Sequence, residues 1–272
     1  MKKFLKYSWL ISLLFWSQVQ ANFVQTEAVP GGVVEFRLNF MGEMPPTVMY
    51  AGQRVAVIRD QQGWHAVLGI PLTAKLGTHT FEFNGKTYQF TVQDKAYPTQ
   101  QVRLNNKRQV NPNAEDMQRI TLEKQQISAA LSQKWTDWVG EATLPLQKPV
   151  NGTLGKGRFG ARRVFNGQPR QPHTGLDLTI AQGTPILAPA DGVVVDVGDY
   201  FFNGNTVFLS HGQGLITMYC HLNDFAVKVG QQVRRGDTLG TVGMTGRATG
   251  PHLHWGVWLN HTWVNPELVT RF

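Results

Sequence analysis

Residues 250–258, near the C-terminus, are the part of the sequence that most constrains the fold. Residues 253–259 are apolar and β-favouring, which predicts a strand. Side chains two residues apart in a strand point to the same face, so His252 and His254 project together. Two imidazoles on a stiff backbone can bind a divalent metal such as zinc. A lone His-x-His pair is more often simply solvated, so residues elsewhere must decide between these interpretations.

A second polar pair lies about eighty residues upstream, in the segment Pro-His-Thr-Gly-Leu-Asp-Leu at 172–178. Pro172 and Gly175 disfavour a helix, so the segment is predicted to be extended and to enter a strand at 176–180. His173 and Asp177 then share a face, and Gly175 leaves room between them. One histidine from 250–258 completes a His/His/carboxylate set with a fourth zinc position open, as in catalytic sites. A structural zinc site usually includes thiolates, and the chain has one cysteine.

A β-hairpin is predicted next, with strands at 206–210 and 215–222 around a glycine-rich turn. Its second strand carries His221. Strand alternation places Cys220 on the opposite face, where we interpret it as a small buried apolar residue, with a thiol nucleophile as the less favoured alternative. His211 beside the turn and His261 in a later turn are expected at the surface, or supporting a ligand.

Together these segments resemble the LytM/lysostaphin-type M23 zinc metallopeptidases, which cut peptide bonds in bacterial peptidoglycan. The resemblance spans residues 159–268 and rests on several motifs in the right order. The motifs are His173-x-x-x-Asp177, His211-Gly212-x-Gly214 with Tyr219-x-His221-Leu222, and Gly250-x-His252-x-His254, flanked by Arg158-Phe159-Gly160, Asn166-Gly167-x-Pro169-Arg170 and Gly183-Thr184-Pro185.

The resemblance implies that His173, Asp177 and His254 bind one Zn²⁺ per chain, while His221 and His252 face the reacting water and the scissile carbonyl. Zinc lowers the pKa of bound water to about 7 and polarises the carbonyl, and a histidine can relay the proton to the leaving amine. The implied activity is that of a zinc metalloendopeptidase acting on peptidoglycan peptide stems. By analogy, the bond is a cross-link of the D-alanyl–diaminopimelate type.

The alternative function is a catalytically silent or autoinhibited peptidoglycan-binding regulator of other cell-wall hydrolases. In that case the metal site is kept but is covered by residues 22–140. The intact motif positions favour the enzyme, and the additional N-terminal region keeps the alternative open.

Residues 1–21 have the layout of a secretory signal peptide, with lysines, a short apolar run and a final Ala21. We expect export across the inner membrane to the periplasm or cell envelope, with an uncleaved N-terminal anchor as the alternative. The formal net charge of +8 suits peripheral contact with an anionic envelope. The basic residues are scattered rather than striped, which argues against a nucleic-acid partner. The oligomeric state has no signal in the sequence.

The remaining pattern predicts a mainly β protein. Residues 22–97 contain short strands with turn residues between them and are predicted to form a small β-sandwich of immunoglobulin-like proportions, in which His65 and His79 are surface or packing residues. Residues 98–140 form a linker with one amphipathic helix at 112–138, on which Trp135 and Trp138 contact a core. Residues 141–272 are predicted to form the peptidase domain. We expect a mostly antiparallel sheet there, with a groove over the face that bears the histidines.

Overall fold

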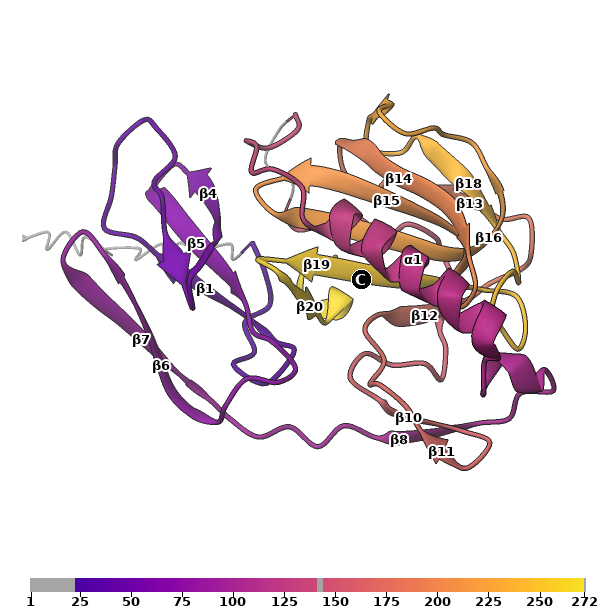
Figure 1. Ribbon diagram of the computed structural model, residues 1–272. Helices are drawn as coiled ribbons and strands as arrows, with labels where there is room; N and C mark the ends of the chain where they lie inside the picture. The colour runs from indigo at the N-terminus through magenta and orange to yellow at the C-terminus, as the bar shows by residue number, and fades with distance from the viewer. Residues whose placement is uncertain (1–22, 141–143, 272) are drawn as a thin grey trace, which may run out of the picture.

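The computed structural model describes residues 23–140 and 144–271 of the chain. Figure 1 shows two β-rich regions with one long helix lying across the larger of them. The prediction of a mainly β fold is therefore confirmed. The segment predicted to be a signal peptide lies outside the described residues.

The N-terminal region consists of short strands around one apolar core. Strands β1, β5 and β4 form a sheet, while β2–β3 and β6–β7 form hairpins. Asn84 and Gly85 both have positive φ, at 50° and 71°, as a tight turn between β6 and β7 requires. The strands are β1 (Val33–Arg37), β2 (Met49–Tyr50), β3 (Gln53–Arg54), β4 (Ala56–Asp60), β5 (Gly63–Gly69), β6 (Gly77–Phe83) and β7 (Lys86–Val92).

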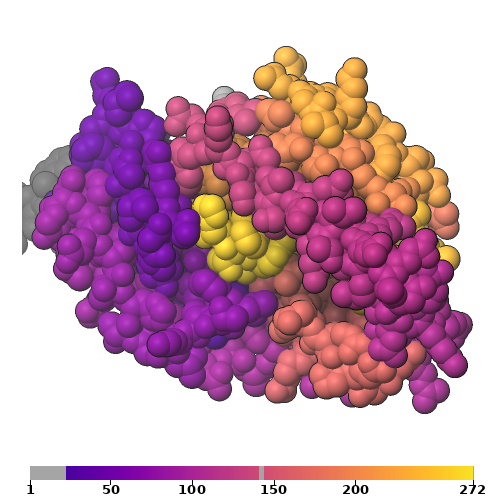
Figure 2. Space-filling model, viewed as in Figure 1, coloured from indigo at the N-terminus to yellow at the C-terminus, as the bar shows by residue number. Residues whose placement is uncertain are grey.

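Strand β5 attaches this region to the rest of the protein. All of its residues are buried, with Leu68 in the N-terminal core and Val67 in the core of the larger region. Hydrogen bonds join the two regions: Gln213 Oε1 accepts from the backbone N of Val57 at 2.7 Å. Figure 2 shows the indigo N-terminal region packed directly against the yellow C-terminal hairpin. Because the core is continuous, the two regions stabilise each other.

The larger region is built on one ten-stranded sheet whose main path runs β17-β14-β15-β16-β19-β12-β9, with antiparallel pairing throughout. A turn at Arg234–Asp237 separates β17 from β18. The ten strands of this sheet are β9 (Thr153–Leu154), β12 (Leu176–Thr179), β13 (Pro185–Leu187), β14 (Gly192–Tyr200), β15 (Gly204–Gly212), β16 (Leu215–Phe225), β17 (Gln232–Val233), β18 (Thr238–Val242), β19 (His252–Leu259) and β20 (Thr262–Val264). Strands β10 (Arg162–Phe165) and β11 (Gln168–Pro169) belong to a separate three-stranded sheet, and the 3₁₀ helix η2 (Pro266–Leu268) follows β20.

The predicted linker packs on the larger region along its length. Strand β8 (Thr99–Val102) pairs in parallel with β10, and the 3₁₀ helix η1 (Lys107–Gln109) follows it. Helix α1 (Ala114–Leu131) begins at Asn113, whose side chain forms a capping box with Asp116. One face of α1 packs on an apolar cluster of the sheet that includes Phe208, Met218 and Cys220. Within the described part of the chain, no helix has the length and apolar character needed to cross a membrane.

The prediction that the helix reaches residue 138 is wrong, because α1 ends at Leu131. The next residues lie outside regular secondary structure and hydrogen bond to the β15–β16 hairpin: the backbone N of Val139 donates to the carbonyl of His211 at 2.9 Å. Trp138 Nε1 donates to the carbonyl of Val57 at 3.0 Å, and Arg54 lies over the ring of Trp135. Both tryptophans thus contact the N-terminal region, and these tertiary contacts outweigh the helical periodicity.

Candidate metal centre and active site

Pairing between β12 and β19 assembles the predicted metal ligands. Asp177 and His254 are direct cross-strand partners, so their side chains lie on the same face. His173, in the loop before β12, completes the set. His173 Nε2 lies 2.8 Å from His254 Nδ1 and 3.1 Å from Asp177 Oδ1, and His254 Nδ1 lies 3.0 Å from Asp177 Oδ1. The three predicted ligand residues therefore converge on one point.

These atoms fit a zinc ion. Nδ1 of His173 lies 3.0 Å from the carbonyl of Arg158, which can only accept, so Nδ1 carries the proton and Nε2 keeps a lone pair. Two ligand atoms bound to a tetrahedral zinc at about 2.0–2.1 Å are about 3.3 Å apart. The observed spacings are only a few tenths of an ångström shorter, so small side-chain shifts would admit the ion.

Arg163 supports Asp177 and was given no role by the sequence analysis. Its Nη2 lies 3.2 Å from Asp177 Oδ2, the carboxylate oxygen that faces away from the two histidines. Burial raises the pKa of Asp177, but its close polar contacts with His173 and His254 outweigh burial and hold the pKa well below its usual range. The carboxyl is therefore ionised at neutral pH, as a metal ligand must be. Arg163 lies in strand β10, beside the Arg158-Phe159-Gly160 motif. This position is the only feature of the sequence that could have pointed to Arg163.

His221 and His252 lie beside this triad, with their ring centroids 4.7 Å apart. Nδ1 of His221 donates to the carbonyl of Thr245, and Nδ1 of His252 donates to the carbonyl of Gly250, each at 2.8 Å. Because both Nδ1 atoms carry the proton, each neutral ring keeps its lone pair on Nε2. His252 Nε2 is 3.9 Å from Asp177 Oδ1, which places that lone pair next to the triad.

A β-bulge turns His221 toward the face that bears the triad. The prediction that Cys220 and His221 point to opposite faces is therefore wrong. Tyr219 pairs with Val207, and Leu222 pairs with Asn205, so two residues of β16 oppose the single Thr206 of β15. His221 has φ of 66°, in the left-handed region. The bulge places both side chains on the triad's face, while Tyr219 and Leu222 pack in the core behind it. Bulges commonly reorient side chains in this way at functional sites.

Burial keeps three histidines of the site, His173, His221 and His254, neutral. It is the main cause that lowers the pKa of His254 to about 4 and of His221 to about 3, with nearby histidines adding to the effect. Burial also lowers the pKa of His173. At neutral pH the rings can therefore offer lone pairs to a metal or accept a proton.

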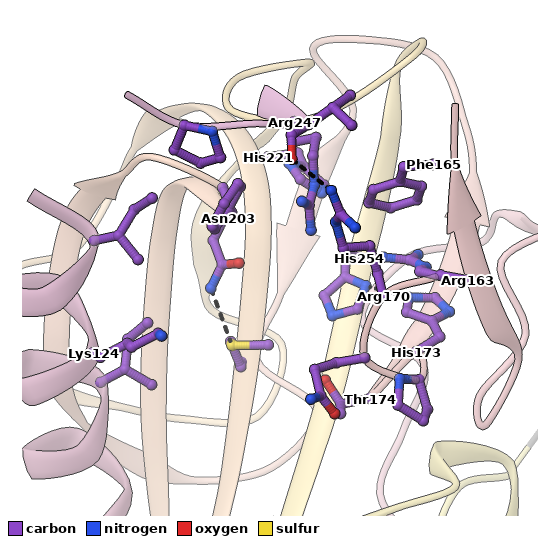
Figure 3. A pocket seen from close by; sticks show the side chains of 18 of the residues that line it. Lys124, Arg163, Phe165, Arg170, His173, Thr174, Asn203, His221, Arg247 and His254 are labelled. Carbon is purple, nitrogen blue, oxygen red and sulfur yellow. Dashed lines mark hydrogen bonds between the residues drawn. The ribbon is translucent and has the colours of Figure 1, made fainter. Parts of the chain in front are cut away.

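The triad opens into a cavity of about 690 Å³ that is bordered by His173, His221 and His254. Figure 3 shows these three side chains directed into it, with Lys124 of α1 on the opposite side. Residues 110–112 and α1 supply one wall, and β10 and the loops around it supply another. Residues 23–97 contribute none of the lining described for this cavity. The predicted groove is therefore present, and the linker rather than the N-terminal β region encloses it.

The histidines outside the site have other environments. His211 is fully buried rather than at the surface, with Nδ1 2.7 Å from the carbonyl of Asp191 and Nε2 2.9 Å from Thr217 Oγ1. His261 is exposed in the β19–β20 turn, as predicted. His65 is buried between Glu35 and Asp60, and His79 hydrogen bonds to Tyr50, so both have packing roles. Burial raises the pKa of Cys220, which keeps it an inert thiol.

His211 should make folding stability depend on pH. Burial lowers its pKa from the ordinary 6.5 to about 4, so below pH 6.5 the unfolded chain binds a proton that the folded chain does not. Between pH 6.5 and 4.5 this residue therefore removes about 2–3 kcal/mol from the free energy of unfolding. We expect urea unfolding of metal-free His211→Gln to lose that much less stability over this interval than the wild type. If the free energy of unfolding changes equally with pH in both proteins, His211 is not held neutral by burial in the folded chain.

Gly175 provides the space that the sequence analysis predicted. A Cβ atom there would lie 2.6 Å from His254 Cε1 and 2.6 Å from the carbonyl oxygen of Trp255. We expect Gly175→Ala to displace the His254 ring and to weaken zinc binding by about 10- to 100-fold, the usual effect of disturbing a ligand's support. The measurement is competition for zinc against a chelator. Gly250→Ala is the control, because a Cβ there meets no atom within 4 Å; equal zinc affinity in the two variants would show that Gly175 has no such role.

Comparison with known proteins agrees with the fold. Residues 171–266 match Peptidase family M23, and residues 26–95 match the Peptidase family M23 N-terminal domain. A crystal structure of a protein from Pseudomonas aeruginosa assigned to peptidase M23 is 41% identical and covers 89% of this chain and 94% of its own, with a TM-score of 0.71. The chain belongs to peptidase family M23, a family of metallopeptidases.

Two relatives are named for their activity. Peptidoglycan DD-endopeptidase ShyC of Vibrio cholerae is 41% identical over 126 residues, which are 46% of this chain and 29% of the relative. DD-carboxypeptidase/endopeptidase Mpg of Neisseria meningitidis is 47% identical over 97 residues, which are 36% of this chain and 22% of the relative. The chain thus spans less than a third of the length of these curated relatives.

Proposed function

We propose that this protein is a secreted zinc endopeptidase that hydrolyses peptide cross-links of peptidoglycan, of the D-alanyl–diaminopimelate type. The observation that carries the proposal is the convergence of His173, Asp177 and His254 at the edge of a cavity, with His221 and His252 beside them. Three ligand atoms with room for a fourth are typical of catalytic zinc sites. The names of the two relatives support peptidoglycan as the substrate.

In the proposed mechanism, His173, Asp177 and His254 would hold the zinc, which activates water and polarises the scissile carbonyl. His221 and His252 supply the proton transfers. Each has its Nδ1 proton tied to a backbone carbonyl, so Nε2 is free to accept a proton from water and later to donate it to the leaving amine. Arg163 holds the Asp177 carboxylate in its orientation through Oδ2.

Digestion of purified peptidoglycan tests this function. We expect the zinc-loaded protein to convert cross-linked muropeptide dimers to monomers, with masses that place the cut between D-alanine and diaminopimelate. Metal-free protein is the control and should be inactive. Unchanged dimers, from a folded protein with zinc bound, would contradict the proposal.

Export is part of the proposal and rests on the N-terminal sequence. If residues 1–21 are a signal peptide, mature protein recovered from the periplasm begins at residue 22. N-terminal sequencing after expression in a bacterium with an outer membrane decides this. An intact N-terminus in the membrane fraction would instead indicate an anchor.

A second candidate, an autoinhibited protein, is favoured by one observation: α1 and residues 110–112 wall the cavity. Helix α1 is fixed there by Glu123, whose carboxylate accepts from the backbone N of Phe201 at 2.9–3.0 Å. If α1 blocks the substrate, Glu123→Ala should raise the rate of hydrolysis several-fold at unchanged zinc content. If the cavity is open as it stands, the same variant should not be faster than the wild type.

A further inference from the structure

The cavity beside the triad is strongly basic. Among the residues that line it are four cations, Lys124, Arg163, Arg170 and Arg247, and no lining residue described for it is an aspartate or glutamate. Lys124 reaches the cavity from α1, while the arginines come from the other side (Figure 3). A concave surface lined by charges of one sign concentrates the opposite charge. The cavity is therefore suited to an anionic part of a ligand.

Arg247 uses few of its hydrogen-bond donors within the described part of the chain. Its guanidinium carbon lies 4.4 Å from the ring centroid of Phe165 and 4.1 Å from that of Phe202, so the two rings hold the group in place. Its one hydrogen bond to another described residue is a long one, from Nη1 to the carbonyl of Gln109 at 3.4 Å. No carboxylate in the described part of the chain pairs with it. Burial, and then the charges of Arg163 and Arg170, lower its pKa to about 10.

Arg170 and Arg163 are committed to other partners. Nη2 of Arg170 donates to the carbonyl of Val110 at 2.8 Å and to Gln168 Oε1 at 2.6 Å, which fixes its charge at the cavity wall. Arg163 pairs with Asp177. Burying a cation without a counter-ion costs free energy. An anion that enters the cavity therefore stabilises Arg247 more than it stabilises Arg163 or Arg170.

The position of Arg247 relates this anion site to the reacting groups. Arg247 follows Thr245, whose carbonyl fixes the ring of His221, and the 245–247 loop is held by Gln109 Nε2 donating to the carbonyl of Gly246 at 2.8 Å. The same short segment therefore positions His221 and presents the arginine. An anion bound by Arg247 would lie on the His221 side of the triad.

We propose that Arg247, assisted by the charge of Arg170, binds a free carboxylate of the substrate peptide next to the scissile bond. The inference rests on the proposed function and specifies its substrate. In a D-alanyl–diaminopimelate cross-link, the carbon bearing the scissile amine nitrogen also bears a free carboxylate, whereas a glycine bridge offers only neutral amides there. Arginine is the residue best suited to bind such a carboxylate through two parallel hydrogen bonds. Arg247 is thus a specificity residue that selects carboxylate-bearing cross-links.

The test compares two cross-linked muropeptide dimers that differ only in whether this carboxylate is free or amidated. For the wild type we expect kcat/KM to be about 10- to 100-fold higher for the free acid, the usual effect of one charge-assisted hydrogen-bonded pair. Arg247→Gln should remove most of this preference, and Arg247→Lys should keep part of it. The control Arg235→Gln, at an exposed turn away from the cavity, should keep all of it. A preference that persists in Arg247→Gln would overturn the proposal.

Binding provides a readout that does not depend on hydrolysis. Calorimetric titration of metal-free protein with the two dimers should show tighter binding of the free acid to the wild type and equal binding to Arg247→Gln. If neither dimer is cut but the acid binds tighter, the proposed function fails while the carboxylate site stands. Equal binding of both dimers to the wild type would refute the site. Displacement of the acid by inorganic phosphate at the same concentration would also refute it, since the site would then take any small anion.

Discussion

His254→Ala should remove zinc binding and lower kcat/KM for cross-link hydrolysis by at least about 10³-fold. His254 Nδ1 lies within 3.0 Å of both other ligand atoms, so its loss leaves only two protein ligands. Catalytic zinc sites use three, and the metal is worth several kcal/mol of transition-state stabilisation. Zinc content by mass spectrometry and the rate of dimer cleavage, measured on the same sample, check this result.

The matched control for this variant is His261→Ala, which removes an exposed histidine of the β19–β20 turn. It should bind about one zinc per chain and keep wild-type activity. Retention of zinc and activity by a folded His254→Ala would show that the metal binds elsewhere.

His221→Asn should keep zinc and lower kcat by about 10²–10⁴-fold, the range expected when a residue that transfers a proton is lost. Asparagine is chosen over alanine because residue 221 has φ of 66°, a left-handed conformation that asparagine tolerates. The variant thus keeps the backbone of the bulge and removes the ring nitrogen that can accept a proton. Single-turnover kinetics with a cross-linked dimer give the rate, and metal analysis gives the zinc content.

Each alternative outcome for His221→Asn has a defined meaning. A kcat within about threefold of the wild type would assign the proton transfers to His252 alone. Loss of a general base should lower the rate by about 10²–10⁴-fold, which is far more than threefold. Loss of zinc would instead make His221 a residue that holds the metal. His79→Asn, in the N-terminal region, is the control for a histidine-to-asparagine change.

Much of the fold follows from local patterns in the sequence. Alternating apolar residues predict most strands to within a few residues, and Asn84-Gly85 predicts the turn between β6 and β7. The convergence of His173, Asp177 and His254 is also foreseeable, because alternation sets which side chains share a face and Gly175 leaves space for the His254 ring. Their role as zinc ligands remains a prediction.

Features that depend on distant contacts could not be predicted. The bulge at His221 arises from a register shift between β15 and β16, which alternation within one strand does not reveal. Helix α1 ends early because Trp138 and Val139 bond to Val57 and His211, far away in sequence. The pairing of Arg163 with Asp177 and the aromatic contacts of Arg247 likewise require the folded chain. These long-range contacts also explain how the linker comes to wall the cavity.

The most direct test of the metal centre is a crystal structure of the zinc-loaded protein with anomalous diffraction measured on both sides of the zinc absorption edge. We expect one strong peak per chain, bonded to His173 Nε2, Asp177 Oδ1 and His254 Nδ1 at about 2.0–2.2 Å, with a fourth position facing the cavity. A peak at any other residues, or no peak in a protein saturated with zinc, would contradict it.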